Sequence, residues 1–352
     1  MVMLSRVRLA AFIDALRRHG EVVAPRPVLD PQASGEYRRY EELRSGELPE
    51  LAPGKPALLP ASHLFLPPRE TMLSYELESG RFTEVLDREP RVVIGVPPCE
   101  AHALALLDQA LSQGVPDRHY RARRENATVV SLACAEPCWE QCFCRQMGTH
   151  RATDGFDLLL TPIDAERFTV ETNTEKGDAL TAELSGVFAP ALDADRAALD
   201  SWNVRCDAAF GPSESWSADP RALVEDGADD PVWSTEAERC LSCGACVLLC
   251  PTCTCFDMVE SVPLPCSAGT RERCRDGCMI PGFSAVAHGA DFRSDRAERL
   301  RHRTRRKFAY QPERYGGGSY CVGCGRCHAH CPVDIGPIGL LKELEKDREE
   351  AR

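Results

Sequence analysis

Residues 240–251 read CLSCGACVLLCP, and residues 321–332 read CVGCGRCHAHCP. Both stretches follow one pattern, in which two, two and three residues separate four cysteines and a proline follows the last cysteine. Cysteines that cluster at such short spacing are typical of metal sites rather than of disulfide frameworks. The repeat therefore predicts two matched metal-binding runs in the last third of the chain.

The spacing within each run is that of bacterial ferredoxins, in which the fourth cysteine of one run binds the cluster held by the other run. A tight loop presents the first three thiols to one cluster. Gly244 and Gly325 occupy the same place in the two loops, where a missing β-carbon lets the backbone come close. We predict one [4Fe–4S] cluster on Cys240, Cys243, Cys246 and Cys331, and a second on Cys321, Cys324, Cys327 and Cys250.

Structural zinc is the alternative for these two runs. A pair of C-x2-C segments can form a zinc ribbon with four thiolate ligands. One zinc ion needs only four thiolates, however, whereas eight cysteines lie here in two matched runs of four. The duplication therefore favours two [4Fe–4S] clusters over zinc.

The length and composition of the chain limit the possible architectures. The chain has 352 residues, which suggests two or three domains. Five of its 19 cysteines lie between Cys99 and Cys144 and thirteen between Cys240 and Cys331, while Cys206 stands alone. A net charge of −12 argues against a dedicated nucleic-acid-binding protein.

The hydrophobic pattern predicts an α/β domain over residues 1–230. Strands are expected over residues 92–96, 127–133, 156–163 and 167–172, and a helix should begin near Glu100. The N-terminus should form an amphipathic helix with inward-facing Leu4, Leu9, Phe12, Ile13 and Leu16. Residues 231–352 should form an α+β bacterial ferredoxin-like dicluster domain with a long insertion at about residues 256–315.

The N-terminal twenty residues do not resemble a secretory signal. Arg6, Arg8, Asp14 and Arg17 interrupt the apolar stretch that such a signal needs. No segment approaches the ~18 consecutive apolar residues of a membrane span. We therefore expect a cytoplasmic protein without a membrane span, whose thiols stay reduced and available as ligands.

The N-terminal cysteines form a second candidate site. Cys99 and Cys134 each follow a predicted strand, and adjacent parallel strands would bring both to one edge of a sheet. Cys142 and Cys144 place two thiols on the same side of an extended loop. We favour a third [4Fe–4S] cluster on Cys99, Cys134, Cys142 and Cys144, with Cys138 as a fifth candidate. Structural zinc and a redox dithiol are the alternatives.

The insertion carries two further features. Cys266, Cys274 and Cys278 lie within it, and Cys253 and Cys255 lie just before it. These five cysteines could form another metal site but are more typical of small buried residues or of thiols that shield a cluster. Residues 296–310, RAERLRHRTRRKFAY, contain seven cations against one acid, Glu298. This basic run is either a solvated helix face, a docking surface for an acidic partner, or a source of positive potential that raises a cluster's reduction potential. RNA binding is not expected in so acidic a chain.

Several stretches resemble one known family. They are LFLPPRETMLSY (64–75), GVPPCEAHAL (95–104), CFCRQMGT (142–149), FDLLLT (156–161), CPTCTCFDMVE (250–260), CMIPGF (278–283), FRSDRAERLRHR (292–303) and CVGCGRCHAHCP (321–332). In this order they resemble the iron–sulfur β subunit of cytosolic bidirectional [NiFe] hydrogenases, the sulfhydrogenase β subunit. The iron–sulfur, electron-input component of anaerobic sulfite reductases is similar. The resemblance covers most of the chain and is more specific than the ferredoxin motif alone.

The resemblance implies a non-catalytic electron-transfer subunit of an oxidoreductase complex. It implies three [4Fe–4S] clusters, one of them in the N-terminal domain. The expected partners are a subunit that binds FAD and NAD(P)H and the small subunit of a [NiFe] hydrogenase. The alternative is the electron-input subunit of an anaerobic sulfite reductase, with a sulfite reductase catalytic subunit as partner.

Two functions of other classes are also considered. An enzyme that binds flavin or substrate in its own N-terminal domain is disfavoured, because the sequence lacks a G-x-G-x-x-G motif, a P-loop and a Ser/His/Asp pattern. A zinc-bearing scaffold would contain zinc and no iron. Iron and acid-labile sulfide analysis separates it from an electron carrier.

Overall fold

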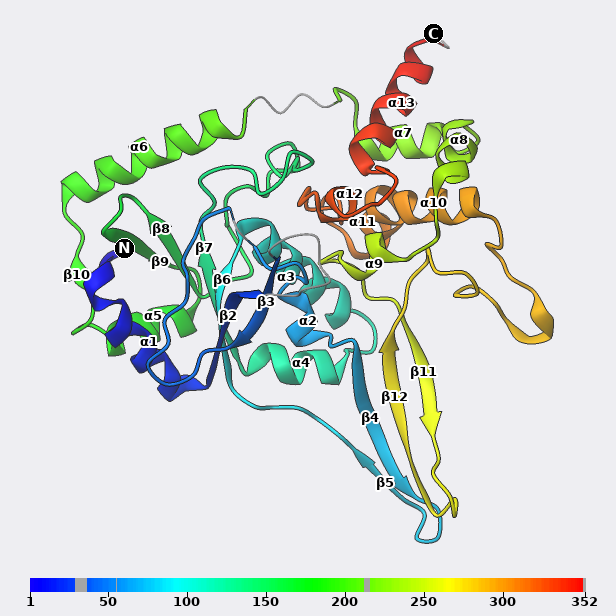
Figure 1. Cartoon of the computed structure of the whole chain (residues 1–352), viewed down its shortest axis with the longest axis horizontal. Helices are drawn as coiled ribbons and strands as arrows, with labels where there is room; N and C mark the ends of the chain where they lie inside the picture. Colours follow the sequence, from blue (N-terminus) through cyan, green and yellow to red (C-terminus); the bar gives the residue numbers. More distant parts are fainter. Residues whose placement is uncertain (29–36, 55, 212–215, 351–352) are drawn as a thin grey trace.

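The computed structural model describes residues 1–28, 37–54, 56–211 and 216–350. The described strands form two sheets (Figure 1). The larger sheet has eight strands in the order β10-β1-β9-β8-β7-β6-β2-β3. Their bounds are β1 Val2–Ser5, β2 Glu21–Val28, β3 Tyr37–Glu42, β6 Arg91–Val96, β7 Ala127–Leu132, β8 Leu158–Pro162, β9 Arg167–Thr172 and β10 Ala189–Pro190.

The centre of the larger sheet is parallel. Strands β2, β6, β7 and β8 pair in parallel, and β3, β9, β1 and β10 add antiparallel strands on either side. The strands β6, β7, β8 and β9 lie where the sequence predicts strands. Helix α3 (Pro98–Ser112) follows β6 and begins close to Glu100, as expected.

Helices cover both faces of this sheet. Val92, Ile94 and Val130 pack in one core with helix α1 (Leu9–Leu16). Alternate residues such as Val93 and Val129 pack in a second core, with α3, α2 (Ser62–Phe65) and α4 (Arg118–Glu125). Because successive strand residues point to opposite faces, the nearly continuous apolar strands supply both cores.

The N-terminus differs from the sequence prediction. It begins with strand β1 rather than a helix, and the predicted core residue Leu4 is buried on that strand. The other four predicted inward residues are buried on α1; they are Leu9, Phe12, Ile13 and Leu16. Strand β1 pairs with both β9 and β10, and this non-local hydrogen bonding overrides the local helical pattern.

Two helices follow β9 on the N-terminal side. They are α5 (Glu175–Glu183) and α6 (Asp193–Ala209). Figure 1 shows α6 on the N-terminal side of the molecule, with the strands of the larger sheet. Trp202 and Cys206 of α6 are buried against Ala133, at the carboxyl end of β7.

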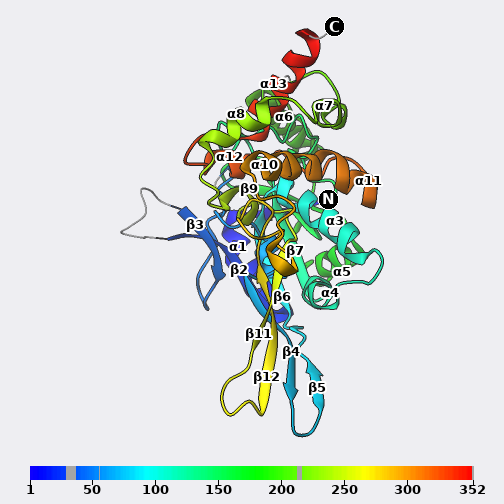
Figure 2. The same ribbon diagram turned by 90° about the vertical axis from the view of Figure 1, so that its right-hand side faces the viewer.

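The second sheet projects from the body as an arm (Figures 1 and 2). Its strands, in the order β11-β12-β4-β5, are β4 Arg69–Glu76, β5 Arg81–Glu84, β11 Phe256–Ser261 and β12 Ala268–Arg275. All three pairings are antiparallel. Strands β11 and β12 of the predicted insertion thus share a sheet with β4 and β5 from the N-terminal part.

The remaining helices pack around the two cysteine runs. Their bounds are α7 Pro220–Asp226, α8 Val232–Arg239, α9 Ala245–Leu248, α10 Arg296–Arg305, α11 Gln311–Tyr315, α12 Arg326–Ala329 and α13 Pro337–Glu350, and a π-helical turn, Arg306–Tyr310, joins α10 to α11. Trp216, Leu223 and Val224 share a core with Leu300 and Leu344. Residues 216–226 therefore pack with the C-terminal part, and a domain division near residue 230 stays a prediction.

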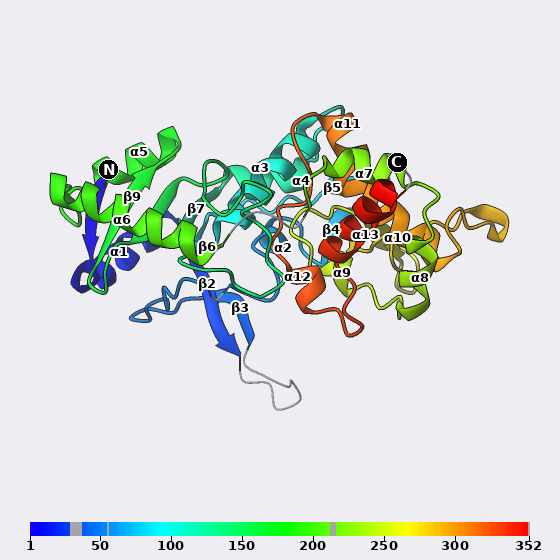
Figure 3. The same ribbon diagram turned by 90° about the horizontal axis from the view of Figure 1, so that it is seen from above.

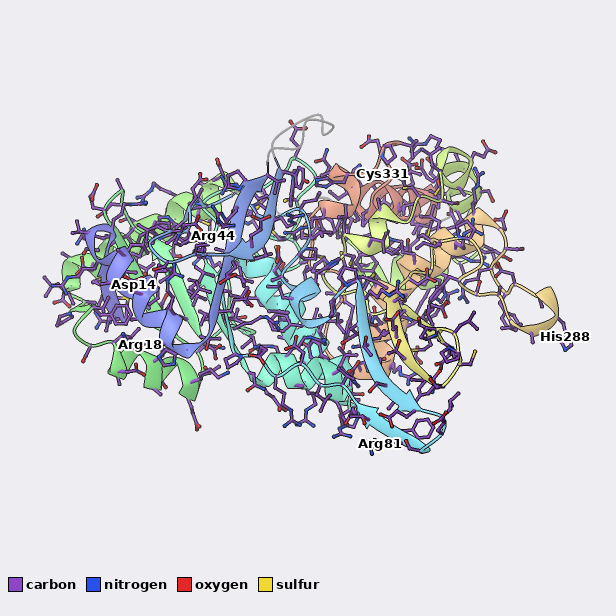
Figure 4. The ribbon with its side chains drawn as sticks, turned by 60° about the horizontal axis from the view of Figure 1, so that its bottom comes forward. Asp14, Arg18, Arg44, Arg81, His288 and Cys331 are labelled. Carbon is purple, nitrogen blue, oxygen red and sulfur yellow. The ribbon has the colours of Figure 1, made fainter. Side chains whose placement is uncertain are left out.

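Viewed from above, the N-terminal sheet and the C-terminal helices lie at opposite ends of the molecule (Figure 3). Figure 4 shows Cys331 within the C-terminal part and Arg81 at the tip of the arm. None of the helices in the described ranges combines the length and apolar character needed to cross a membrane.

Candidate metal centres

The first run and the last cysteine of the second run surround one cavity, called here the first cavity. Its thiols belong to Cys240, Cys243, Cys246 and Cys331. Cys240 ends helix α8, Cys246 lies on the short helix α9, and Cys331 follows α12. The structure thus brings together all four residues predicted for one cluster.

A second cavity has the reciprocal composition. It is lined by Cys321, Cys324, Cys327 and Cys250. Cys250 comes from the first run, just as Cys331 of the second run lines the first cavity. The exchange of the last thiol follows from the α9 and α12 turns, each of which carries its fourth cysteine away from its own loop.

The loop glycines have the conformation that the motif requires. Gly244 and Gly325 have φ values of 76° and 74°, in the left-handed region. The atoms that surround the two glycines differ, however. A β-carbon on Gly325 would lie 2.8 Å from the backbone nitrogen of Cys142, whereas one on Gly244 would meet the side chain of Ile280. Gly325 is therefore needed both for the turn and for contact with the N-terminal cysteine loop.

The N-terminal cysteines line a third cavity at the carboxyl ends of β6 and β7. All five contribute, namely Cys99, Cys134, Cys138, Cys142 and Cys144. Cys99 lies in the first turn of α3, and Cys134 follows β7, the parallel neighbour of β6. A bulge between Ile94 and Val96 shifts the β6–β7 register just before Cys99. Such bulges redirect a chain next to functional sites.

Cys138 lies among the four favoured N-terminal ligands. Interaction with Cys134, together with burial, raises the pKa of the Cys138 thiol well above its usual value. The described geometry brings five thiols to the third cavity where a cluster needs four. Which four bind metal stays a prediction.

Each cavity has at least one thiol that is withdrawn from water, Cys246 in the first and Cys324 in the second and third. Burial raises the pKa of Cys246 and of Cys324 to about 12, so both thiols are protonated at neutral pH when no metal is bound. Iron coordination deprotonates cysteine. Metal binding at these cavities should therefore release protons.

The third cavity adjoins the second. The Cys142 thiol lies 3.3 Å from the carbonyl oxygen of Cys324, which it contacts as a hydrogen-bond donor. The amide of Phe143 donates to the carbonyl of Gly323 over 2.8 Å. Cys324 itself lines both cavities. Arg303 lines both the first and the second cavity, so the three cavities share walls in a row.

The basic run is not a uniformly solvated helix face. Arg299, Arg303 and Lys307 are buried, with 5–6% of their surfaces exposed, and they recur every four residues along α10 and the π-helical turn. Arg303 Nη2 donates to the carbonyl of Cys246 at 3.3 Å. Lys307 Nζ donates to the carbonyl and hydroxyl oxygens of Thr252 at 3.0 and 2.8 Å.

Arg326 is a cation that sequence reasoning missed. It is fully buried, lines the third cavity and forms an ion pair with the buried Glu100. Its guanidinium also lies 5.3 Å from the ring centre of Trp139. The backbone amide of Ala61 donates to Glu100 at 2.6 Å. Only the position of Arg326 within a cysteine loop hinted at a role, because its partner is 226 residues away.

The insertion cysteines divide by burial. Cys253 and Cys278 are buried, whereas Cys255 and Cys274 are partly buried and Cys266 is exposed. The backbone amide of Cys253 donates to the carbonyl of Cys250 at 3.3 Å, and Cys250 lines the second cavity. Cys253 therefore has the position expected of a shielding thiol.

The three cavities fit [4Fe–4S] clusters by the nature of their walls. Among the described side chains, no three His, Cys, Asp or Glu residues converge as ligands of one metal ion; the thiols surround a volume instead. Buried cations stand beside these thiols, and the Nε atoms of Arg299 and Arg303 have no hydrogen-bond partner. An anionic, thiolate-bound cluster would balance such charges.

Comparison with known proteins adds the family. Residues 239–335 match the 4Fe-4S dicluster domain family. Over 336 residues, or 95% of each chain, the sequence is 32% identical to sulfhydrogenase 2 subunit beta of Pyrococcus furiosus. The chain belongs to the sulfhydrogenase β-subunit family. This confirms the resemblance seen in the sequence, and an iron–sulfur protein of electron transfer fits both findings.

The two matches differ in how much of the chain they cover. The matched dicluster segment spans the first and second cavities, whereas the third cavity lies outside it. The relative extends across 95% of the chain and so includes the N-terminal cysteine region. The number of clusters and their ligands remain predictions.

Proposed function

We propose that this chain holds three [4Fe–4S] clusters and connects a subunit that binds FAD and NAD(P)H with the small subunit of a [NiFe] hydrogenase. When bound, such clusters accept and release single electrons. The chain's own residues would bind the clusters, exclude water from them and set their order. No residue is assigned a bond-making role.

The observation that carries this proposal is the row of three thiol-lined cavities. Arg303 forms a wall between the first and second cavities, and Cys324 forms a wall between the second and third. A chain built only to be stabilised by metal would not need adjoining sites. Adjoining sites are what stepwise electron transfer requires.

Both ends of the row come close to the surface. At the first cavity, Cys243 is exposed, and its neighbour Leu241 keeps 62% of its surface exposed. At the third cavity, Cys138, Trp139 and His330 line a surface groove of about 280 Å³. Two separate ends support contact with two different partners.

Anaerobic purification of the chain with its bound proteins tests the proposal. We expect about twelve irons and as many acid-labile sulfides per chain, no flavin in the isolated chain, and co-purification of a flavoprotein and a [NiFe] hydrogenase. About eight irons would leave two clusters only. A sirohaem protein in place of the hydrogenase would favour the sulfite reductase alternative. A colourless, iron-free chain would contradict the proposal.

A further inference from the structure

Two kinds of buried cation stand beside the three cavities. Arg326, at the third cavity, forms an ion pair with Glu100. Arg303 and Lys307, by contrast, have no carboxylate within ion-pairing distance among the described residues. The positive charge is therefore neutralised at one end of the row and left uncompensated at the other.

Arg303 is the charge shared by two sites. It lines the first and the second cavity, and the thiols that interact with it electrostatically include Cys246 of the first and Cys327 and Cys250 of the second. Among the residues that the structure describes, Arg303 donates a hydrogen bond only to a backbone carbonyl, and its buried Nε has no partner. A guanidinium held in this way needs anionic neighbours to offset its desolvation.

Lys307 acts on one site only. It lines the second cavity and lies one helical turn beyond Arg303. Its main electrostatic partners are the thiols of Cys250 and Cys253, and its ammonium is fixed by two hydrogen bonds to Thr252. Of the described cations, Arg303 and Lys307 line the second cavity and Arg303 lines the first, whereas Arg299 and Arg275 lie nearby and line neither.

Reduction adds negative charge to a cluster, and an uncompensated cation stabilises the reduced form more than the oxidised form. A neutral ion pair has a much smaller effect. We propose that Arg303 and Lys307 raise the reduction potentials of the clusters in the first and second cavities above that of the third, so that electrons pass downhill from the N-terminal site into the dicluster region. This rests on the proposed three-cluster function and adds the order of potentials to it.

Redox titration of the intact, anaerobically purified chain, followed by EPR, tests the proposal. We expect Arg303→Gln to lower two of the three midpoint potentials and Lys307→Gln to lower one. Each shift should reach at least a tenfold change in the one-electron equilibrium constant, which is ~59 mV. Arg303→Lys should restore the wild-type values, because it returns the charge.

Two further variants give the controls. Arg296→Gln removes the same charge from an exposed position on the first turn of α10 and should leave all three potentials unchanged. Glu100→Gln leaves Arg326 without its carboxylate and should raise the potentials of the two clusters next to it, those on Cys324 and on Cys99, a shift of the opposite sign. A cation that merely supports the fold would produce no such pattern of signs.

The outcomes separate this inference from the proposed function. If the wild-type chain binds no iron, the proposed function fails and the inference fails with it. If it binds iron and the potentials of Arg303→Gln and Lys307→Gln equal those of wild type and Arg296→Gln, only the inference is overturned. If Arg303→Gln cannot be isolated with full iron content, Lys307→Gln and Glu100→Gln still test the inference. Potentials that shift in opposite directions support it, and unchanged potentials overturn it.

Discussion

Gly325 shows how one backbone position ties the two cysteine regions together. Its left-handed conformation opens the second ferredoxin loop, and the N-terminal loop passes directly over it, at Cys142. Any side chain there meets backbone atoms that cannot rotate away. The conformational strain and the close approach are separate effects, and they can be measured separately.

Gly325→Ala should lower the free energy of unfolding by clearly more than the ~1–2 kcal/mol of left-handed strain alone. It should also reduce the iron content, because the second and third cavities share this contact. Gly282→Ala is the matched control: its φ is 83°, and nothing lies within 4 Å of the added carbon. Denaturant unfolding and iron analysis measure both. Equal losses in the two variants would show that the close approach contributes nothing.

His63 contributes a pH dependence at the junction of the two parts of the chain. Its Nε2 lies 2.9 Å from the carbonyl oxygen of Leu248, and burial, followed by the charge of Arg275, lowers its pKa to about 3. The folded chain therefore keeps this ring neutral at pH values where the unfolded chain protonates it. The stabilisation is present above pH ~6.5 and is lost as the pH falls towards 3.

His63→Gln should therefore lose less stability than wild type on acidification. Between pH 7.5 and pH 5.5 the difference should be about 1 kcal/mol in the free energy of unfolding, from urea titrations at the two pH values. Replacement of the more exposed His19, on the N-terminal side, by Gln serves as the control. Parallel pH profiles for wild type and His63→Gln would contradict the assignment.

At the scale of elements, the basic run 296–310 shows that a sequence of cations does not reveal which of them are buried. Its sequence is compatible with a solvated face, a docking surface or a source of potential. The structure divides the run, since Arg299, Arg303 and Lys307 face the core while Arg296 faces solvent. A spacing of four residues places side chains on one helix face, but it does not reveal which face is buried.

The arm is a second element whose attachment depends on buried charge. Glu70 of β4 forms ion pairs with Arg123 of α4 and Arg273 of β12, and all three side chains are buried. Arg273 also pairs with Asp117. This cluster joins the insertion to the N-terminal part.

Glu70→Gln should destabilise the chain by about 2–3 kcal/mol, less than the ~3–5 kcal/mol of a fully orphaned buried charge, because Arg123 keeps Asp87 and Arg273 keeps Asp117 as partners. Limited proteolysis should then cut within the β11–β12 hairpin sooner than in wild type. Glu76→Gln changes an exposed carboxylate on the same strand and should behave like wild type in both assays. Unchanged proteolysis of Glu70→Gln would show that strand pairing alone holds the arm.

At the scale of the whole molecule, the exchange of the fourth thiol decides which parts of the chain depend on each other. Cys331 belongs to the second run but lines the first cavity. Cys331→Ser should therefore lose one cluster, about four of twelve irons per chain. Cys266→Ser, at an exposed cysteine of the insertion, should lose none.

Double variants identify which cluster is lost. Cys240→Ser combined with Cys331→Ser should lose only the one cluster of the first cavity, whereas Cys321→Ser combined with Cys331→Ser should lose two. Iron analysis with EPR distinguishes these patterns. The reverse pattern would mean that each run binds its own four cysteines.

The sequence by itself determined the two matched cysteine runs, the cysteine-rich N-terminal region and the strands that precede Cys99 and Cys134. These features follow from the spacing and hydrophobic pattern of residues that are close together in the sequence. Cys240, Cys243 and Cys246 are neighbours along the backbone, so their loop is implied by the residues between them.

Only the tertiary structure decided that three cavities adjoin, that the insertion pairs with β4, and that Arg326 meets Glu100 while Arg303 meets no carboxylate among the described residues. Each of these depends on residues separated by long stretches of chain, and spacing along a sequence carries no information about such distant neighbours. Whether a buried charge is balanced is a property of the assembled interior, because desolvation and ion pairing arise only when the surfaces that exclude water have come together.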